Sequence, residues 1–259
     1  MASRRRVAFV VPRYGVEVSG GAEQLCRQVA ERLSQDLEVE VLTSCALHYE
    51  RWANHFPRGS ETINGVTVHR SPTTVERDPE GFAYFTERTI ARPGHSTMDE
   101  LQWILLQGPS VPELVDRVSG WRGRYDLYVF FSYLYFPTYF GLPLVADKAV
   151  FVPLAHDEPF FHLELFRPLF YLPRRIVYMT PEEQSLVAWR FGKAVAPGEV
   201  IGAGVDPPPR GDPGRFRRAF GIADDFILYV GRVNPSKGCR ELVELFATYK
   251  ALRPSRLKL

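Results

Sequence analysis

The sequence predicts an α/β fold with a parallel, doubly wound sheet, followed by the start of a second α/β domain. Short apolar runs typical of buried strands alternate along the chain with segments of helical periodicity. The run at 127–131 is apolar throughout, as parallel sheets covered on both faces require. A stretch rich in proline and glycine, 202–214, separates this pattern from one more strand and helix. We therefore expect a first domain at 1–202, a linker at 203–224 and a second domain at 225–259.

The first strands and the first helix have clear patterns. Residues 6–11 form an apolar run, and the helix after Gly21 repeats apolar residues at helical spacing as far as Leu33. Residues 38–43 alternate between polar and apolar types and predict the second strand. The Asn64-Gly65 turn then predicts a hairpin that joins 61–63 to 66–69.

The middle of the chain is less regular. Residues 71–97 are rich in proline, threonine and charge, which predicts a long loop with one helical turn. Two prolines divide 99–118 into two helices, and the strand 127–131 follows. The aromatic run at 133–140 is expected to form the core of a helix, although stacking on sugars is the alternative.

The last elements of the first domain are a strand at 149–154, a strand at 176–179 and a short strand at 199–201. Thr180, a first-turn proline and two glutamates open a helix that extends to about Phe191. The apolar segment 160–175 ends in two arginines; packing beside a cleft is expected there, and contact with a membrane surface is the alternative.

Length, charge and hydropathy exclude several classes of protein. The chain has 259 residues and a formal net charge of +2, too close to neutral to indicate nucleic-acid binding. The apolar run that follows the basic residues 4–6 ends before Pro12, which is too short for a signal peptide. No stretch approaches the roughly 18 apolar residues that span a bilayer. We therefore expect a cytoplasmic protein.

Two cations follow the expected strand 226–230. Arg232 and Lys237 lie between this strand and a helix that starts near Glu241. A helix N-terminus offers unpaired N–H groups and a positive dipole, so a loop of this kind suits a diphosphate. An ordinary turn with solvated cations explains the same residues and, for an isolated pair, is the more frequent case.

Glycines follow the first strand. Gly15, Gly20 and Gly21 allow a phosphate or sugar to approach the backbone closely, or they form a tight turn that binds no ligand. The loop does not have the G-x-G-x-x-G pattern, and the chain has no Gly-Lys-Ser/Thr phosphate loop. Dinucleotide and P-loop cofactors are therefore disfavoured.

Ionisable residues follow the strand 149–154. His156, Asp157 and Glu158 come at its carboxyl end, where open α/β sheets bind ligands. Such groups orient sugar hydroxyls or carry a proton away from an acceptor; a polar loop capped by Asp157 is the alternative. No second cluster has the spacing of metal ligands, so we expect no metal site.

Two strings of residues resemble one family of enzymes. Tyr-Val-Gly-Arg-Val-Asn-Pro-Ser-Lys-Gly, at 229–238, closely resembles the start of the C-terminal domain in family 4 glycosyltransferases, which are retaining enzymes of the GT-B architecture. Ser-Gly-Gly-Ala-Glu, at 19–23, resembles the glycine-rich loop and helix start of their N-terminal domain. The resemblance runs from about residue 5 to the last residue and is densest at 6–33, 150–206 and 226–246. It implies two Rossmann-like domains, the first of them on the acceptor side.

The resemblance also implies an activity. A sugar moves, with retention, from a UDP- or GDP-linked donor to a glycan, glycoside or lipid-linked acceptor, as in polysaccharide biosynthesis. Arg232 and Lys237 match the residues that hold the donor diphosphate, and we expect neither a cofactor nor a divalent ion. His156 and Asp157 match a His-Asp pair that is frequent at this strand end, and we expect both to act in catalysis. Contact of such an enzyme with the inner face of the membrane is one further expectation.

The remaining site residues come from the loops at the strand ends. Gly15, Gly20 and Gly21 are expected to bind the donor phosphates. The residues expected to bind the acceptor are Tyr14, Glu23, Ser132, Tyr133 and Glu158. One position departs from the family, because Phe131 stands where many relatives carry a histidine. This departure leaves the handling of the acceptor open.

The second domain is expected to be truncated. A doubly wound domain needs more than about 100 residues, and 225–259 provides far fewer. The family's Glu-x7-Glu donor motif is absent from this part, and we regard the same spacing of Glu23 and Glu31 as a coincidence. We therefore expect an inactive fragment that lacks its C-terminal domain. Two alternatives remain: an epimerase or hydrolase of the same architecture, and a non-catalytic module that binds nucleotide sugars or glycans.

Overall fold

A computed structural model describes residues 4–205, 207, 210–231, 233 and 237–259. The chain divides into two compact units, residues 1–204 and residues 205–259. The strands of the first unit are β1 (Arg6–Val10), β2 (Glu38–Ser44), β3 (Gly59–Ile63), β4 (Val66–Ser71), β5 (Leu127–Phe131), β6 (Ala149–Val152), β7 (Arg175–Tyr178) and β8 (Gly198–Val200). Its α-helices are α1 (Gly21–Leu33), α2 (Pro79–Phe85), α3 (Thr97–Gln107), α4 (Pro112–Gly120), α5 (Phe136–Gly141), α6 (Arg167–Tyr171) and α7 (Pro181–Phe191).

The sheet confirms the predicted fold class. Its eight strands lie in the order β3-β4-β2-β1-β5-β6-β7-β8, and only the edge strand β3 is antiparallel to its neighbour. The antiparallel pair β3–β4 is the hairpin predicted around Asn64-Gly65, where Asn64 has a φ of 48°. The order reverses at β1, because the chain adds strands first on one side of β1 and then on the other. A doubly wound sheet results.

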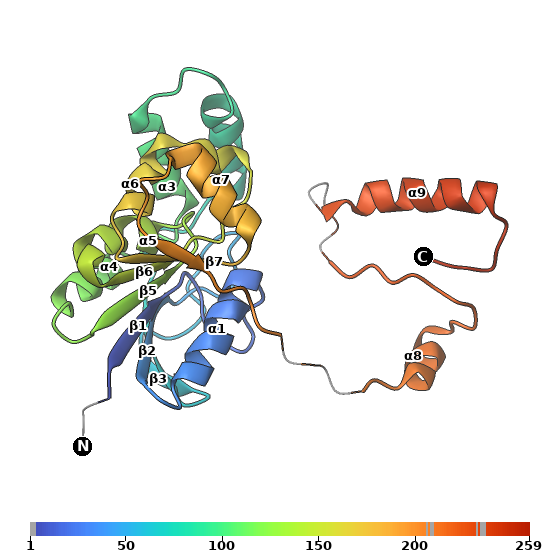
Figure 1. The fold of residues 1–259 in the computed structure, drawn as a ribbon, viewed down its shortest axis with the longest axis horizontal. Coiled ribbons are helices and arrows are strands. Elements are labelled where there is room, and N and C mark those ends of the chain that lie inside the picture. The colour runs from blue at the N-terminus through green and yellow to red at the C-terminus, as the bar shows by residue number, and fades with distance from the viewer. Residues whose placement is uncertain (1–3, 206, 208–209, 232, 234–236) are drawn as a thin grey trace. The chain divides into compact units, whose positions relative to one another are not determined.

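Helices cover both faces of this sheet (Figure 1). Alternate residues of β1 point to opposite faces, as the period of a strand requires. Val7 and Phe9 pack toward α1, in a core that includes Cys26 and Ala30. Ala8 and Val10 belong to a larger core on the other face, which helices α3 to α7 cover. Buried apolar area on both faces explains why β1, β5 and β6 are largely apolar without alternation.

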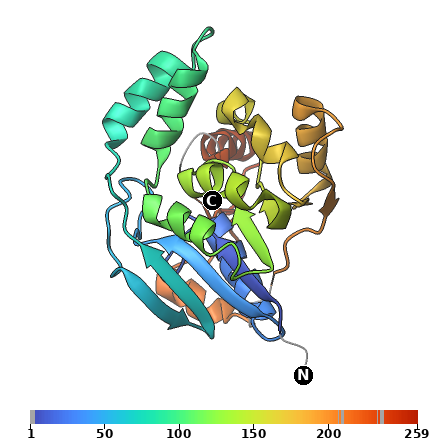
Figure 2. The same ribbon diagram turned by 90° about the vertical axis from the view of Figure 1, so that its left-hand side faces the viewer.

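The segment 71–97 differs from its prediction. A long loop with one helical turn was expected, and the structure has two consecutive helical elements. The N-cap residue Asp78 accepts hydrogen bonds from the N–H groups of Glu80 and Gly81, and Pro79 starts α2. A π-helical turn, Thr86–Ile90, follows α2 directly. The ring of Phe82 packs against Trp103 of α3 at a centroid distance of 5.8 Å. Figure 2 shows α2 and α3 (turquoise to green) extending together beyond the sheet, and we call residues 79–107 the helical arm.

A polar network lies where β2 begins. The Glu40 carboxylate, largely buried, accepts hydrogen bonds from His69 Nε2 at 2.5 Å, Arg124 Nη2 at 2.8 Å and Tyr125 Oη at 2.7 Å. Burial raises the pKa of Glu40, but these hydrogen bonds outweigh burial and lower it to about 2. Because the pKa is lower in the folded than in the unfolded state, Glu40 stabilises the fold above about pH 4.5.

We expect this stabilisation to disappear as the pH falls from about 4.5 toward 2. Glu40→Gln should therefore be less stable than the wild type at pH 6 and should lose less stability between pH 5 and pH 3. Urea unfolding at the three pH values measures both differences. Glu38→Gln, at a side chain that is 51% exposed, is the control and should behave as the wild type does. An equal loss of stability on acidification in Glu40→Gln and in the wild type would contradict the assignment.

The described residues of the second unit include the α-helices α8 (Pro213–Phe220) and α9 (Cys239–Leu252). Helix α8 lies within the range 203–224 that was expected as a linker, and α9 confirms the predicted C-terminal helix. The strand predicted at 226–230 is wrong: these residues make one isolated bridge, between Phe226 and Lys258. Phe226 stacks on Phe216 of α8 at 5.5 Å. A strand needs neighbours to be stable, and none pairs with 226–230 beyond this bridge in the part of the chain described here.

Candidate active site at the carboxyl edge of the sheet

The point where the strand order reverses lies between β1 and β5. The loops that follow β1, β5 and β6 all leave the carboxyl edge of the sheet, since these strands are parallel. The first loop carries Gly20, the second carries Ser132 and the third carries His156. In open α/β sheets, ligands bind in the crevice that forms at this reversal. The predicted site residues of the first unit therefore lie on loops of one edge.

A buried ion pair shapes the loop after β1. The guanidinium of Arg13 donates to Glu23 Oε1 from Nη2 at 2.6 Å and from Nε at 2.9 Å, and both side chains are less than a tenth exposed. Arg13 also donates to the carbonyls of Ser19 and Leu47. Sequence reasoning missed Arg13, whose one signal is its position directly after the first strand. In the structure, Arg13 donates to one oxygen of the Glu23 carboxylate, Oε1, and the predicted binding of an acceptor by Glu23 stays a prediction.

The glycines of this loop differ in what surrounds them. Gly20 has a φ of 153°, and a Cβ there would lie 2.1 Å from Glu23 Oε2, so the ion pair leaves no room for a side chain. A Cβ on Gly21 would meet open space. Tyr14 is completely buried, and its hydroxyl has no hydrogen-bond partner among the residues described. Ligand binding by Gly15, Gly20, Gly21 and Tyr14 stays a prediction.

Residues after β5 connect two of the loops. Ser132 has a φ of 67°, a conformation that side chains rarely adopt, and it is buried. Tyr133 is fully buried and donates a hydrogen bond to Glu158 Oε1 at 2.6 Å. Burial raises the pKa of Tyr133, and the carboxylate of Glu158 adds to the effect. Phe131, in the position where a histidine was expected, stacks on Phe9 in the core.

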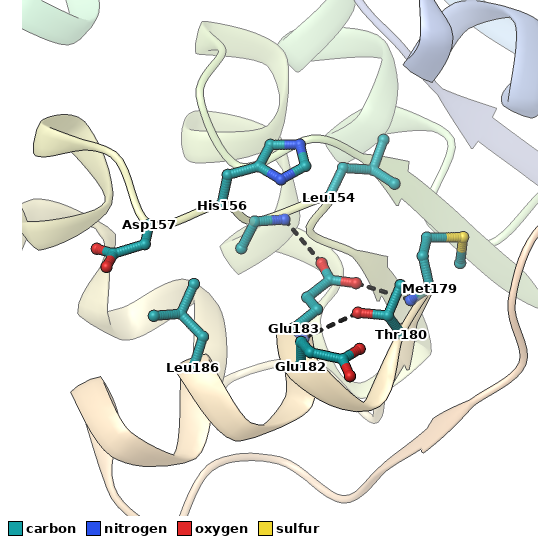
Figure 3. Close-up of a pocket in the computed structure, with 9 residues that line it drawn as sticks. Leu154, His156, Asp157, Met179, Thr180, Glu182, Glu183 and Leu186 are labelled. Carbon is teal, nitrogen blue, oxygen red and sulfur yellow. Dashed lines mark hydrogen bonds between the residues drawn. The ribbon is translucent and has the colours of Figure 1, made fainter. Parts of the chain in front are cut away.

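The loop after β6 lines a cavity of about 380 Å³ (Figure 3). Its lining residues are Leu154, Ala155, His156, Asp157, Met179, Thr180, Glu182, Glu183 and Leu186. His156 and Asp157 are exposed. Their side chains point in different directions in Figure 3, and Asp157 Oδ1 contacts His162 Nε2 at 2.8 Å. Leu154 has a φ of 54°, which is strained for a bulky residue. Strain of this kind concentrates at functional sites.

Glu183 fixes the shape of this cavity. Its buried carboxylate accepts hydrogen bonds from the N–H groups of Ala155 and Met179, both at 2.7 Å (Figure 3). The two N–H groups follow β6 and β7, so one side chain joins the ends of two strands. Burial raises the pKa of Glu183, and the two backbone hydrogen bonds oppose this shift. The sequence predicted the capping of this helix by Thr180, but it did not reveal the link to Ala155.

The second unit carries the other half of the predicted donor site. Lys237 is exposed and lies just before α9, whose N-cap residue Gly238 has a φ of 66°. Arg232 lies outside the described residues. The diphosphate-binding roles of Arg232 and Lys237 therefore stay predictions.

The described residues show neither a cluster of metal ligands nor a helix able to span a membrane. Within the described residues, no three or more His, Cys, Asp or Glu side chains gather as metal ligands would. None of the helices described is both long and apolar enough to traverse a bilayer. Metal independence, a cytoplasmic location and contact with a membrane surface stay predictions.

Three solved structures are similar to this chain in fold. No family model and no curated protein matches the chain. An α,α-trehalose-6-phosphate synthase from Burkholderia multivorans matches with a TM-score of 0.62 and 13% identity, over 97% of this chain and 62% of that chain. A sucrose-phosphate synthase from Thermosynechococcus elongatus matches with a TM-score of 0.48 and 13% identity, over 78% of this chain and 91% of that chain. UGT2 from Phytolacca americana, complexed with UDP-2fluoro-glucose and pterostilbene, matches with a TM-score of 0.43 and 10% identity, over 80% and 56% of the two chains.

The match to the trehalose-6-phosphate synthase concerns the fold, and this chain spans less than two thirds of that protein. Together with the doubly wound sheet, it shows that the chain has an α/β, Rossmann-like fold, as this neighbour from the GT-B glycosyltransferases does.

Proposed function

We propose that the whole protein is a retaining glycosyltransferase of family 4, which moves a sugar from a UDP- or GDP-linked donor to a glycan, glycoside or lipid-linked acceptor. The observation that carries the proposal is the convergence of polar loops at the strand-order reversal of a GT-B fold. The loop after β6 carries His156, and Tyr133 links the loop after β5 to Glu158. The resemblance of 229–238 to the donor-binding loop of the family supports the same activity.

The proposed reaction assigns work to each unit. The bond between the anomeric carbon and the diphosphate oxygen breaks, and its electron pair stays on that oxygen. Arg232 and Lys237 stabilise the resulting negative charge. Their two positive charges take the place of a divalent ion. The oxygen of the acceptor hydroxyl bonds to the same face of the anomeric carbon and loses its proton. His156, exposed at the edge of the cavity, orients this hydroxyl or carries its proton away.

An analysis of products tests the proposal. The whole protein is incubated with UDP- and GDP-sugars, with and without sugar acceptors, in the presence of EDTA. A glycoside of unchanged anomeric configuration and an equal amount of nucleoside diphosphate are the expected products, resolved by NMR. Free sugar would identify a hydrolase, an epimerised sugar would identify an epimerase, and binding without turnover would identify a binding module. An inverted anomer, or loss of transfer with EDTA, would contradict the proposed mechanism.

A further inference from the structure

A second cavity lies beside the helical arm. It has a volume of about 480 Å³, which is within the range of sites that bind small molecules. The segment 75–78 and helix α2 form one wall, and helix α3 forms the other. No residue predicted from the sequence to bind donor or acceptor is among its lining residues. The proposed function therefore leaves this cavity without a role.

The walls of this cavity expose apolar side chains. Val75 and Tyr84 are each 65% exposed, Leu105 is 48% exposed and Leu106 is 38% exposed. Large apolar side chains scattered singly over a surface are ordinary, but these four line one hollow. Clustered exposure of this kind costs free energy that a bound apolar group recovers.

The floor of the cavity is rigid. Trp52 has a φ of 59°, and its Nε1 donates to the carbonyl of Gln107 at 2.7 Å. The guanidinium of Arg77 lies 5.7 Å from the centroid of the Trp52 ring and 4.9 Å from that of Phe82. Its N–H groups donate to Gln107 Oε1 and to backbone carbonyls, among them that of Glu50. Both floor residues are therefore fixed before a ligand arrives.

The charges of the cavity disfavour an anion. Arg77 is the one cation among the described residues of the lining. Its N–H groups already donate to Gln107 Oε1 and to the carbonyls of Tyr49 and Glu50. The other charged residues of the lining, Glu76 and Asp78, are acidic. The Asp78 carboxylate caps α2 through the N–H groups of Glu80 and Gly81. An anionic ligand would thus meet two carboxylates and a cation with most of its donors occupied.

The floor of the cavity contacts two residues beside the candidate active site. The ring of Trp52 packs edge-on against Tyr135, just after β5, at a centroid distance of 5.6 Å. The guanidinium of Arg13 lies 5.9 Å from the centroid of the same Trp52 ring. Arg13 and Tyr135 come from the two loops that flank the reversal of strand order. A molecule that fills the cavity would therefore lie next to the crevice where transfer is proposed.

We propose that this cavity binds the apolar group, an alkyl chain or an aromatic ring, of an uncharged acceptor. The volume fits such a group, and its binding would remove the exposed apolar side chains of the walls from water. The carboxylates of Glu76 and Asp78 in the lining disfavour ligands that carry a carboxylate or a phosphate. The role of the bound molecule as an acceptor rests on the proposed function. The binding of an uncharged amphiphile in this cavity does not.

Binding to this chain tests the inference without a donor. Isothermal titration with octyl β-D-glucoside, below the concentration at which it forms micelles, should show saturable binding. Glucose lacks the apolar group and octanoate carries a negative charge, so each should bind at least tenfold more weakly. Leu105→Glu should weaken octyl glucoside binding at least tenfold, and Tyr84→Ser should weaken it in the same direction. Met98→Glu is the matched control, because Met98 is a 71% exposed residue of the same helix that does not line the cavity.

Several outcomes would overturn the inference. They are the absence of octyl glucoside binding, equal binding of octanoate, and equal affinity in Leu105→Glu and Met98→Glu. Loss of vesicle binding or of self-association in Leu105→Glu, with octyl glucoside binding unchanged, would identify a membrane or a second copy as the occupant. Failure of sugar transfer with binding intact would contradict the proposed function alone. Transfer to octyl glucoside with unchanged kcat/KM in Leu105→Glu would contradict the inference alone.

Discussion

Lys237→Ala in the whole protein is expected to lower the turnover of sugar transfer by about 10²-fold or more. This is the scale of loss when one charge-stabilising donor is removed from a developing anion. Lys237 is exposed and precedes α9, so its ammonium is free to meet the diphosphate at a helix N-terminus. The measurement is kcat under saturating donor, with the unfolding midpoint recorded for each variant.

Arg240→Ala is the control for Lys237→Ala. Arg240 carries the same charge in the first turn of α9, its side chain is 88% exposed, and it pairs with Glu244. Its replacement should leave kcat within about twofold, since an exposed pair contributes little. If Lys237→Ala kept wild-type turnover, the donor diphosphate would not lie at this loop.

Glu23→Ala is expected to lower the free energy of unfolding by about 3–5 kcal/mol. The substitution leaves Arg13, whose side chain is 5% exposed, with a buried charge that lacks its counter-ion. Urea unfolding of this chain measures the loss. Glu31→Ala is the control on the same helix, where Glu31 pairs with Arg27 and both side chains are more exposed than those of Arg13 and Glu23, at 22% and 23%; it should cost less than Glu23→Ala, at most about 1 kcal/mol.

Glu23→Gln, compared with Glu23→Ala, separates a structural role of Glu23 from a direct role in acceptor binding. A structural role through Arg13 predicts that Glu23→Gln, which keeps the shape of the side chain, also loses stability. A direct role in acceptor binding predicts instead a higher KM for the acceptor with unchanged stability. The second result, together with a loss of less than 1 kcal/mol in Glu23→Ala, would contradict the structural role.

The sheet could be predicted because its central strands carry their own signals, an apolar run in β1, β5 and β6 and an alternating pattern in β2. Residues 127–131 and 149–152 needed no knowledge of their neighbours to be recognised. The strand at 226–230 was wrong for the converse reason, because an apolar run forms a strand only where another strand pairs with it. In the helical arm, α3 matches the first of the two helices predicted within 99–118. Helix α2 was missed because proline and charge suggested a loop with one helical turn, whereas Asp78 caps a helix that packs on Trp103.

The site could be predicted only in part. Loops at strand ends follow from the topology, and this placed His156 and Gly20 at one edge of the sheet. Contacts between residues distant in sequence do not follow from local patterns. Glu183 bonds to Ala155, which precedes it by 28 residues, and Trp52 bonds to Gln107, 55 residues later. These contacts form only in the folded chain, so no local pattern predicts them.

Turnover of His156→Ala in the whole protein tests most directly whether the active site lies at the carboxyl edge of the sheet. A catalytic role for His156 predicts a loss of kcat of at least about 10²-fold, the scale of a missing proton-transfer or orienting group. The unfolding midpoint should not change, since His156 is exposed. His55→Ala, at another exposed histidine that lines neither cavity, is the control and should keep wild-type turnover. A kcat of His156→Ala within twofold of the wild type would contradict the placement of the active site at this edge of the sheet.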